Sequence, residues 1–258
     1  MILKDKTALV CGASSGIGRS CAVELARLGA QVVLLARSKE SLEKLKEELG
    51  NRAYNQPLVL DIGQLDNLEF SVKKVLADIG PVEIVICNTG GPPKGEIFKA
   101  SMQEFNQAFQ NHVIANSLLA KLLVPGMKEK SYGRIINIIS TSVKSPIPNL
   151  GVSNTIRAAV ASWAKTLSWE LARYNITVNN VLPGFTLTAR LQSLLEQAAE
   201  EKQCSVDDVA QEWRNKVPMG RFGTSKEIAA VVGFLASPLA SYVNGVNLPV
   251  DGGRTLAL

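Results

Sequence analysis

The sequence is poor in the residues that build metal and redox sites. Its 258 residues include one histidine, His112, and four cysteines, Cys11, Cys21, Cys87 and Cys204. The cysteines are far apart and form no C-x-x-C pair, so neither a zinc site nor a redox dithiol is indicated. We therefore expect no metal. We expect three of the thiols to be buried and reduced, because they lie within apolar patterns.

Long apolar runs and dense charge clusters are also absent. No uninterrupted apolar stretch reaches the length that spans a bilayer, and no signal-peptide pattern precedes the first apolar run. Lysine and arginine exceed aspartate and glutamate by 28 to 23, but no five or six like charges are consecutive. Nucleic acids and membranes are therefore not expected partners, and we expect a cytoplasmic protein.

A glycine-rich turn between a strand and a helix stands near the start of the chain. The apolar run 7–10 leads into it, and a helical pattern of apolar residues follows it. Glycines let the backbone bend sharply and approach a pyrophosphate, and the free N–H groups of the helix favour phosphates. This context predicts a dinucleotide site whose contacts are Gly12, Ser14, Ser15, Gly16, Ile17 and Gly18.

Short apolar runs alternate with helical patterns along the rest of the chain. This alternation predicts one α/β domain over residues 1–258, a Rossmann-type doubly wound parallel sheet of about seven strands with right-handed crossovers. Ligands of such a fold bind at the carboxyl edge of the strands. The expected strands are 7–10, 31–35, 58–60, 82–87, 133–140, 176–182 and 246–250, and the main expected helices are 39–49, 65–78, 102–127, 157–172 and 226–235.

The pattern changes at residues 187–217. Two polar amphipathic helices, near 189–203 and 206–215, stand outside the alternation of strands and helices. An insertion after a strand's carboxyl end can cover a site, so we interpret it as a small helical lid. The alternative is a surface decoration or an oligomer contact.

The end of the second expected strand indicates which dinucleotide binds. An acidic residue there would accept hydrogen bonds from the ribose 2′-OH of NAD, whereas an arginine accommodates the 2′-phosphate of NADP. The chain has Arg37 there and no carboxylate, and Arg19 could reach the same phosphate. NADP(H) is therefore favoured over NAD(H), although either arginine alone could be an ordinary surface residue.

Other residues at the ends of expected strands complete the predicted cofactor site. A carboxylate at Asp61 could accept from the adenine amino group, or simply cap the next helix. The remaining expected cofactor contacts at this edge are Ile62, Asn88, Thr89, Gly90, Pro183, Gly184 and Thr186.

Several ordered motifs resemble those of the short-chain dehydrogenase/reductase family over essentially the whole chain. The glycine-rich turn matches the family's G-x-x-x-G-x-G loop, although Cys11 stands where threonine is usual. Residues 88–90 are similar to its N-A-G strand end, and the strand 134–140 is similar to the one that ends in its active-site serine. Further matches are residues 179–184, 218–221 and 250–253. The closest resemblance is to proteins described as 3-oxoacyl-(acyl-carrier-protein) reductase-like.

The resemblance implies a serine, a tyrosine, a lysine and an asparagine as catalytic groups. Ser140 matches the serine, but Ser153 and Arg157 stand where tyrosine and lysine are expected, and His112 stands where asparagine is expected. A one-residue slip would make Asn111 the match instead of His112. A serine hydroxyl is a far weaker acid than a phenol, and arginine can hold the nicotinamide ribose but cannot exchange protons.

Two functions fit this pattern. The first is an NADP(H)-dependent oxidoreductase that transfers hydride between nicotinamide and a small carbonyl or alcohol substrate, with an atypical proton donor. Its candidate catalytic residues are Ser140, Ser153, Arg157 and His112, and Arg157 would also contact the cofactor. The alternative is a non-catalytic dinucleotide-binding protein, either a cofactor sensor or a partner subunit of an active relative. We expect Tyr132 and Tyr174 at the opposite edge of the sheet, where neither could replace the missing phenol.

The resemblance also implies a homo-oligomer, a tetramer or a dimer. Two helices would supply its apolar faces, although some of these residues must instead face the sheet. The candidate residues are Val113, Leu118, Leu122, Val160, Trp163 and Leu167.

Overall fold

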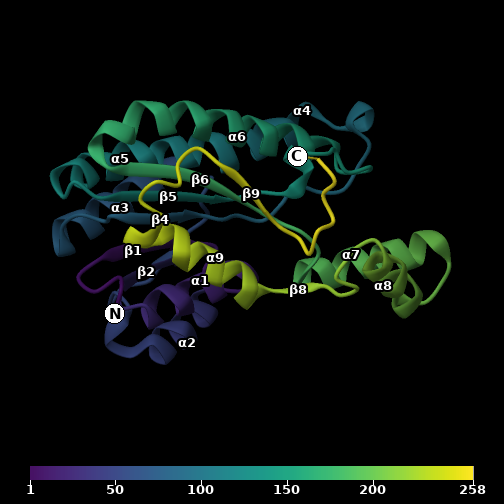
Figure 1. Ribbon diagram of the computed structural model, residues 1–258, viewed down its shortest axis with the longest axis horizontal. Helices are drawn as coiled ribbons and strands as arrows, with labels where there is room; N and C mark the ends of the chain where they lie inside the picture. The colour runs from purple at the N-terminus through teal and green to yellow at the C-terminus, as the bar shows by residue number, and fades with distance from the viewer. Residues whose placement is uncertain (258) are drawn as a thin grey trace.

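A seven-stranded parallel sheet forms the centre of the computed structural model, which describes residues 1–257 (Figure 1). Its order is β3–β2–β1–β4–β5–β6–β9, so the predicted Rossmann-type fold is confirmed. The chain moves outward from β1 to β3 and then returns to β4 on the other side of β1. In doubly wound sheets this reversal opens a crevice at the carboxyl ends of the strands. The strands are β1 (Thr7–Cys11), β2 (Gln31–Ala36), β3 (Leu58–Val59), β4 (Ile84–Cys87), β5 (Gly133–Ile138), β6 (Ile176–Pro183) and β9 (Asn247–Val250).

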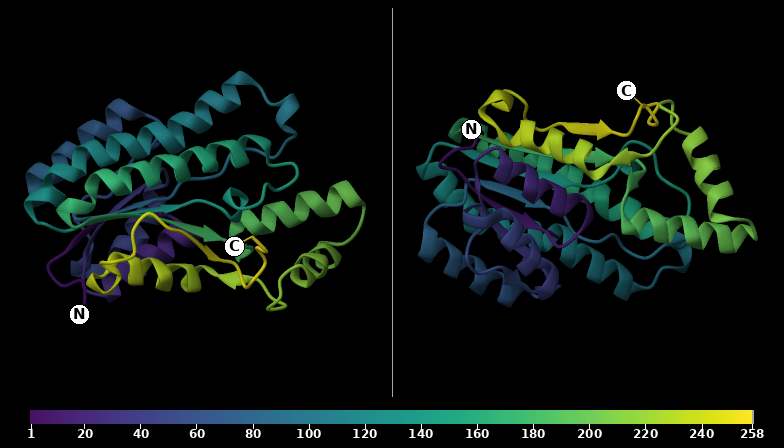
Figure 2. Two further views of the ribbon diagram at one scale, coloured as in Figure 1. Left: turned by 45° about the horizontal axis from the view of Figure 1, so that its top comes forward. Right: turned by 90° about the horizontal axis from the view of Figure 1, so that it is seen from below.

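Helices cover both faces of the sheet (Figure 2). The side chains of β1 alternate between the two layers: Ala8 and Val10 pack under one set of helices, and Leu9 and Cys11 under the other. The first set is α1 (Gly16–Arg27), α2 (Lys39–Leu49) and α9 (Ser225–Ala236), and the second is α3 (Leu65–Ile79), α5 (Ala115–Glu129) and α6 (Gly151–Leu171).

The helix expected at 102–127 has an irregular centre. It consists of α4 (Met102–Phe109), a five-residue π turn at Gln110–Ile114, and α5. A π turn inserts one wider turn into a helix and is frequent at functional sites. His112 lies within this turn and is buried.

The start of α6 differs from the expected range of 157–172. The helix begins at Gly151, six residues earlier, although residues 151–156 include glycine and β-branched types that favour helices poorly. Val152 and Ile156 lie one turn apart and are buried in a small cluster with Ala108, so tertiary packing stabilises this turn. Ser153 therefore lies on the first turn of α6.

The insertion at 187–217 contains two helices, α7 (Ala189–Lys202) and α8 (Val206–Asn215), as expected. Their apolar faces form a cluster of their own with Phe222. Two short strands, β7 (Thr186–Leu187) and β8 (Gly223–Thr224), pair at its base. Figure 1 shows α7 and α8 beyond the end of the sheet, on the side where the strands finish.

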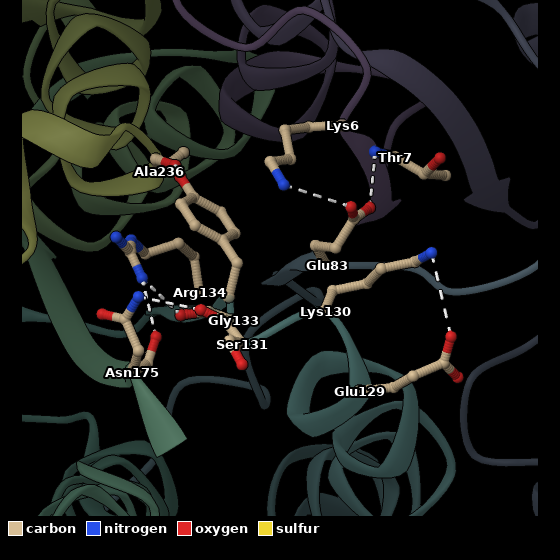
Figure 3. Close-up of polar contacts among 11 residues, drawn as sticks. Lys6, Thr7, Glu83, Glu129, Lys130, Ser131, Gly133, Arg134, Asn175 and Ala236 are labelled. Carbon is tan, nitrogen blue, oxygen red and sulfur yellow. Dashed lines mark hydrogen bonds and ion pairs between the residues drawn. The ribbon is translucent and has the colours of Figure 1, made fainter. Parts of the chain in front are cut away.

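The opposite, amino edge of the sheet is held by polar contacts (Figure 3). Glu83 accepts a hydrogen bond from the Thr7 backbone, and the buried Arg134 guanidinium donates to the carbonyl of Gly133. The Tyr132 hydroxyl donates to the carbonyl of Ala236 at 2.6 Å. The Tyr132 hydroxyl is thus hydrogen-bonded at the amino edge of the sheet, away from Ser140, as expected.

Burial also tests two predictions about side chains. Cys11, Cys21 and Cys87 are buried free thiols and Cys204 is exposed, as expected, and burial raises the pKa of Cys11 and Cys21 to about 12. Val160 is fully buried, so its suggested place in an oligomer face is wrong. Leu118, Leu122, Trp163 and Leu167 are partly buried against the core. Within residues 1–257, no helix has the length and apolar character needed to cross a membrane.

Candidate functional site

The carboxyl ends of the strands border a cavity of about 1510 Å³. Its wall includes the turn after β1, the ends of β2, β4, β5 and β6, the first turns of α6, and the inner face of α7. Of the predicted site residues, only Gly18 does not line it. The predicted site residues that line the cavity are Gly12, Ser14, Ser15, Gly16, Ile17, Arg19, Arg37, Asp61, Ile62, Asn88, Thr89, Gly90, His112, Ser140, Ser153, Arg157, Pro183, Gly184 and Thr186.

The turn between β1 and α1 has a backbone that only glycine fits comfortably. Gly12 has φ +63°, and a Cβ on Gly18 would lie 2.1 Å from the Gly12 carbonyl oxygen. Gly18 therefore lies beneath the turn and allows the helix to approach it. Asn88, at the end of β4, donates from Nδ2 to the Cys11 carbonyl at 3.3 Å and fixes the turn from below.

The first turn of α1 can receive an anion. Its N-cap, Ser15, makes no side-chain hydrogen bond to the helix, whereas Ser38 and Thr188 do cap α2 and α7. Gly16 and Ile17, which begin the helix, line the cavity. Uncapped N–H groups at a helix N-terminus bind phosphates, so the observed turn fits a dinucleotide pyrophosphate.

Two arginines flank the end of β2, but they differ in their partners. Arg19 forms an ion pair with Glu48 of α2. The Arg37 side chain is 81% exposed, and its Nη1 lies 3.9 Å from Asp61 Oδ2 across the strand ends. A solvated contact of this length is weak, so Arg37 has the freer charge for a phosphate.

Ser140 lies just beyond β5 and faces the cavity. Its Oγ accepts a hydrogen bond from the Ser142 N–H at 3.0 Å, which leaves its own proton free to donate. Ser153 and Arg157 lie one turn apart on α6 and also line the cavity. Arg157 is only 7% exposed, and its Nη1 donates to the Ile138 carbonyl at 2.9 Å.

His112 is held neutral by its surroundings. Burial, and then the charge of Arg157, lower the pKa of His112 to about 2, although a hydrogen bond with the Gly90 backbone acts in the opposite direction. Asn111, the alternative match, accepts from Gln107 and lies against Gly63. His112 is thus the residue beside Arg157, and as a neutral imidazole it can relay a proton but not supply one as a cation.

We expect His112→Asn to make the protein more resistant to acid. Unfolded histidine takes a proton below pH 6.5, whereas folded His112 does not until about pH 2. The free energy of unfolding therefore decreases as the pH falls below 6.5, by about 1.4 kcal/mol per pH unit for a fully buried histidine. Urea unfolding at pH 7.5 and 5 should show a loss about 2 kcal/mol smaller in the variant. Equal losses would mean that His112 is protonated in the fold.

Comparisons with known proteins agree with this geometry. A family model described as "Enoyl-(Acyl carrier protein) reductase" matches residues 12–255. The 3-oxoacyl-(acyl-carrier-protein) reductase FabG of Pseudomonas aeruginosa is 35% identical over 100% of both chains. The NADPH-dependent reductase BacG of Bacillus subtilis is 29% identical over 97% of this chain and 98% of its own.

A solved structure gives the same result. L-sorbose reductase from Gluconobacter frateurii, solved in complex with NADPH and L-sorbose, has a TM-score of 0.93 and 29% identity over 100% of both chains. The match therefore extends over the whole sheet and the insertion. The chain belongs to the short-chain dehydrogenase/reductase family.

The resemblance implies a catalytic tyrosine, but the tyrosines lie outside the described cavity wall. Within residues 1–257, none of the four tyrosines lines the cavity. Tyr132 is bound to Ala236, and Tyr54 donates to Asp78. The hydroxyl group at the position of the expected phenol is that of Ser153, and it lines the cavity together with Ser140.

The sequence analysis missed two residues that line the cavity, Arg190 and Arg254, and one that positions a loop of its wall, Asn154. Arg190 lies in the first turn of α7 and donates from Nη2 to the Pro92 carbonyl at 3.1 Å. A cation there opposes the helix dipole, which was a signal that could have been noticed. Arg254 stacks on the Phe185 ring, with 4.2 Å from its guanidinium carbon to the ring centre. Asn154 exchanges two hydrogen bonds with the Ile147 backbone and holds the loop before α6 over the cavity.

Proposed function

We propose that the protein is an NADPH-dependent oxidoreductase that transfers hydride between the nicotinamide and a carbonyl or alcohol carbon. The observation that supports this most is that an anion-ready glycine turn, Arg37 and Ser140 share one cavity. BacG is described as NADPH-dependent and L-sorbose reductase was solved with NADPH, which supports the same cofactor here.

The residues have separate tasks in this proposal. The turn from Gly12 to Gly18 and the start of α1 bind the pyrophosphate, and Arg37 binds the 2′-phosphate. Asp61 and Ile62 contact the adenine. When bound, NADPH supplies the hydride. The nicotinamide half contacts Asn88, Thr89, Gly90, Arg157, Pro183, Gly184 and Thr186.

The substrate oxygen would lie next to Ser140, whose hydroxyl is free to donate a hydrogen bond. That bond stabilises the negative charge that develops on the oxygen. The proton then comes from solvent through the hydroxyls of Ser140 and Ser153 or through neutral His112, because no phenol is present. Proton transfer along such a path is slower than direct donation by a positioned acid, which typically raises the rate of a reaction by about 10²- to 10⁴-fold.

The proposal extends to the assembly and to the insertion. We propose that α7 and α8 act as a lid on the bound substrate, that the protein forms a homo-oligomer, and that it works in the cytoplasm. The partly exposed apolar residues of α5 and α6, Leu118, Leu122, Trp163 and Leu167, are the proposed contact surface.

The test is NADPH oxidation with a panel of aldehydes, ketones and oxo acids. We expect measurable turnover with at least one compound, and Ser140→Ala should lower kcat at least tenfold with the Kd of NADPH unchanged. Fluorescence titration measures that Kd separately. The missing phenol gives a second candidate, a non-catalytic dinucleotide sensor. Tight NADPH binding without oxidation by any compound would favour the sensor and contradict the oxidoreductase.

A further inference from the structure

Two arginines from different parts of the chain converge at one point of the cavity wall. Arg157 comes from α6, and Arg190 comes from the first turn of α7. A Cβ built on Gly91 would lie 3.9 Å from Arg157 Nη2 and 4.0 Å from Arg190 Nη2. Among residues 1–257, no other atom lies within 4 Å of that point apart from Gly91 itself and its two chain neighbours. Gly91 thus leaves an open space that two guanidinium groups face.

Both guanidinium groups are fixed by backbone carbonyls. Arg157 Nη1 donates to Ile138 at 2.9 Å, which directs its Nη2 into the cavity. Arg190 Nη2 donates to Pro92 at 3.1 Å, so this group stays next to the same loop. These anchors restrict both side chains before any ligand arrives, and preorganised donors bind with a smaller loss of side-chain freedom.

The two arginines lack a carboxylate partner in the part of the chain that the structure describes. Within residues 1–257, no carboxylate oxygen lies within 4.0 Å of either guanidinium group. Four carboxylates line the same cavity. Asp61 faces Arg37, Glu104 accepts from Ser101, Glu212 bonds Lys202 and Lys216, and Glu201 pairs with neither Arg157 nor Arg190. Buried charges in proteins are usually paired, but the buried Arg157 has no carboxylate partner among these residues, and the like charge of the exposed Arg190 repels it. Burial, and then Arg190, lower the pKa of Arg157 to about 10, which reflects that cost.

We propose that Arg157, Arg190 and Gly91 bind an oxyanion of the substrate, so that this enzyme acts on oxo acids or hydroxy acids. The inference rests on the proposed function and names its substrate class. A carboxylate against Gly91 can accept from Nη2 of both arginines, and the planar fork of arginine suits that geometry. A phosphate ester offers the same oxygens and is the second source of such an anion.

The position of Arg190 gives the anion a second effect. Because Arg157 belongs to the core and Arg190 to the insertion, a bound anion links α7 to the sheet. Neutralising the repulsion between the two arginines stabilises the position of α7 next to residues 91–92. A neutral ketone makes no such link, so it should be a poorer substrate even where its carbonyl fits beside Ser140.

The experiment is calorimetric titration of the NADP⁺-bound protein with 2-, 3- and 4-oxopentanoate and with their methyl esters. Dihydroxyacetone phosphate tests the phosphate source. Arg190→Gln should raise the Kd of at least one oxo acid more than tenfold and leave the esters unchanged. Gly91→Ala should also weaken the binding of the oxo acid, because the alanine methyl group occupies the open space. The φ of Gly91 is not in the positive range, so the backbone tolerates alanine there. Lys94→Gln, which removes one cation elsewhere in the cavity wall, should have little effect.

Each outcome either supports or contradicts the proposed oxyanion site. Acid binding that responds no more to Arg190→Gln than to Lys94→Gln would overturn the inference. So would a rise in the Kd of NADPH itself in Arg190→Gln, because Arg190 would then contact the cofactor, as Arg157 does in the proposed function. Binding of dihydroxyacetone phosphate alone would assign the site to phosphate esters. Binding of acids that depends on Arg190, without NADPH oxidation, would support the inference while contradicting the oxidoreductase.

Discussion

Arg37→Asp should bind NADPH at least a hundredfold more weakly than the wild type, and NADH no more weakly. Arg37 lies at the end of β2 in the cavity wall, with only a long contact to Asp61. The variant loses a charge-assisted hydrogen bond to the 2′-phosphate, worth about 1.5–3 kcal/mol, and adds a carboxylate that repels it. The new carboxylate can instead accept from the 2′-OH of NADH. Fluorescence titration with both cofactors measures the change.

Arg19→Ser is the matched control for this prediction. Its guanidinium group is already paired with Glu48, so we expect less than a tenfold change in the Kd of NADPH. Equal weakening of NADPH and NADH in Arg37→Asp would show that the residue supports the turn rather than the phosphate. A larger effect in Arg19→Ser than in Arg37→Asp would assign the phosphate to the other arginine.

The double variant Ser153→Tyr with Arg157→Lys should raise the turnover of a neutral ketone by about 10²-fold or more. Both positions line the cavity one turn apart on α6, so a phenol and an ammonium group placed there become neighbours. A nearby cation lowers the pKa of a phenol from about 10 toward neutrality and makes it a useful acid. Steady-state NADPH oxidation with a fixed ketone measures the gain.

A phenylalanine control separates acid chemistry from packing in this experiment. Ser153→Phe with Arg157→Lys has almost the same bulk as the double variant but no hydroxyl, so it should show no gain. A gain as large as that of the tyrosine variant would mean that filled space, not proton donation, raised the rate. No gain in either variant would show that another group already delivers the proton.

The sequence was sufficient for the fold because local signals agree with the packing. Helix α2 runs from Lys39 to Leu49 as expected, since Ser38 caps its start and Gly50 follows its end with φ +57°, a value that glycine adopts easily. The early start of α6 could not be predicted in this way. Its first turn depends on burial of Val152 and Ile156 against Ala108, which is distant in the sequence.

The site was predictable where it lies at strand ends and not elsewhere. Parallel strands bring their carboxyl ends to one edge, so Arg37, Asn88 and Ser140 could be placed together from the pattern alone. Arg190 reaches the site only because α7 folds back over the cavity. The neutral state of His112 depends on its burial beside Arg157, a contact between two helices that no spacing rule gives.

The separate packing of the insertion affects how this protein's sequence can diverge in evolution. Helices α7 and α8 share an apolar cluster with Phe222 that includes no residue of the sheet's own clusters, and β7 and β8 join its two ends. Residues 188–222 can therefore be replaced by a different segment without repacking the main core, provided that the two short strands still pair. Under the proposed function, the contacts that α7 and α8 make with the substrate can in this way change while the cofactor contacts at the sheet stay the same.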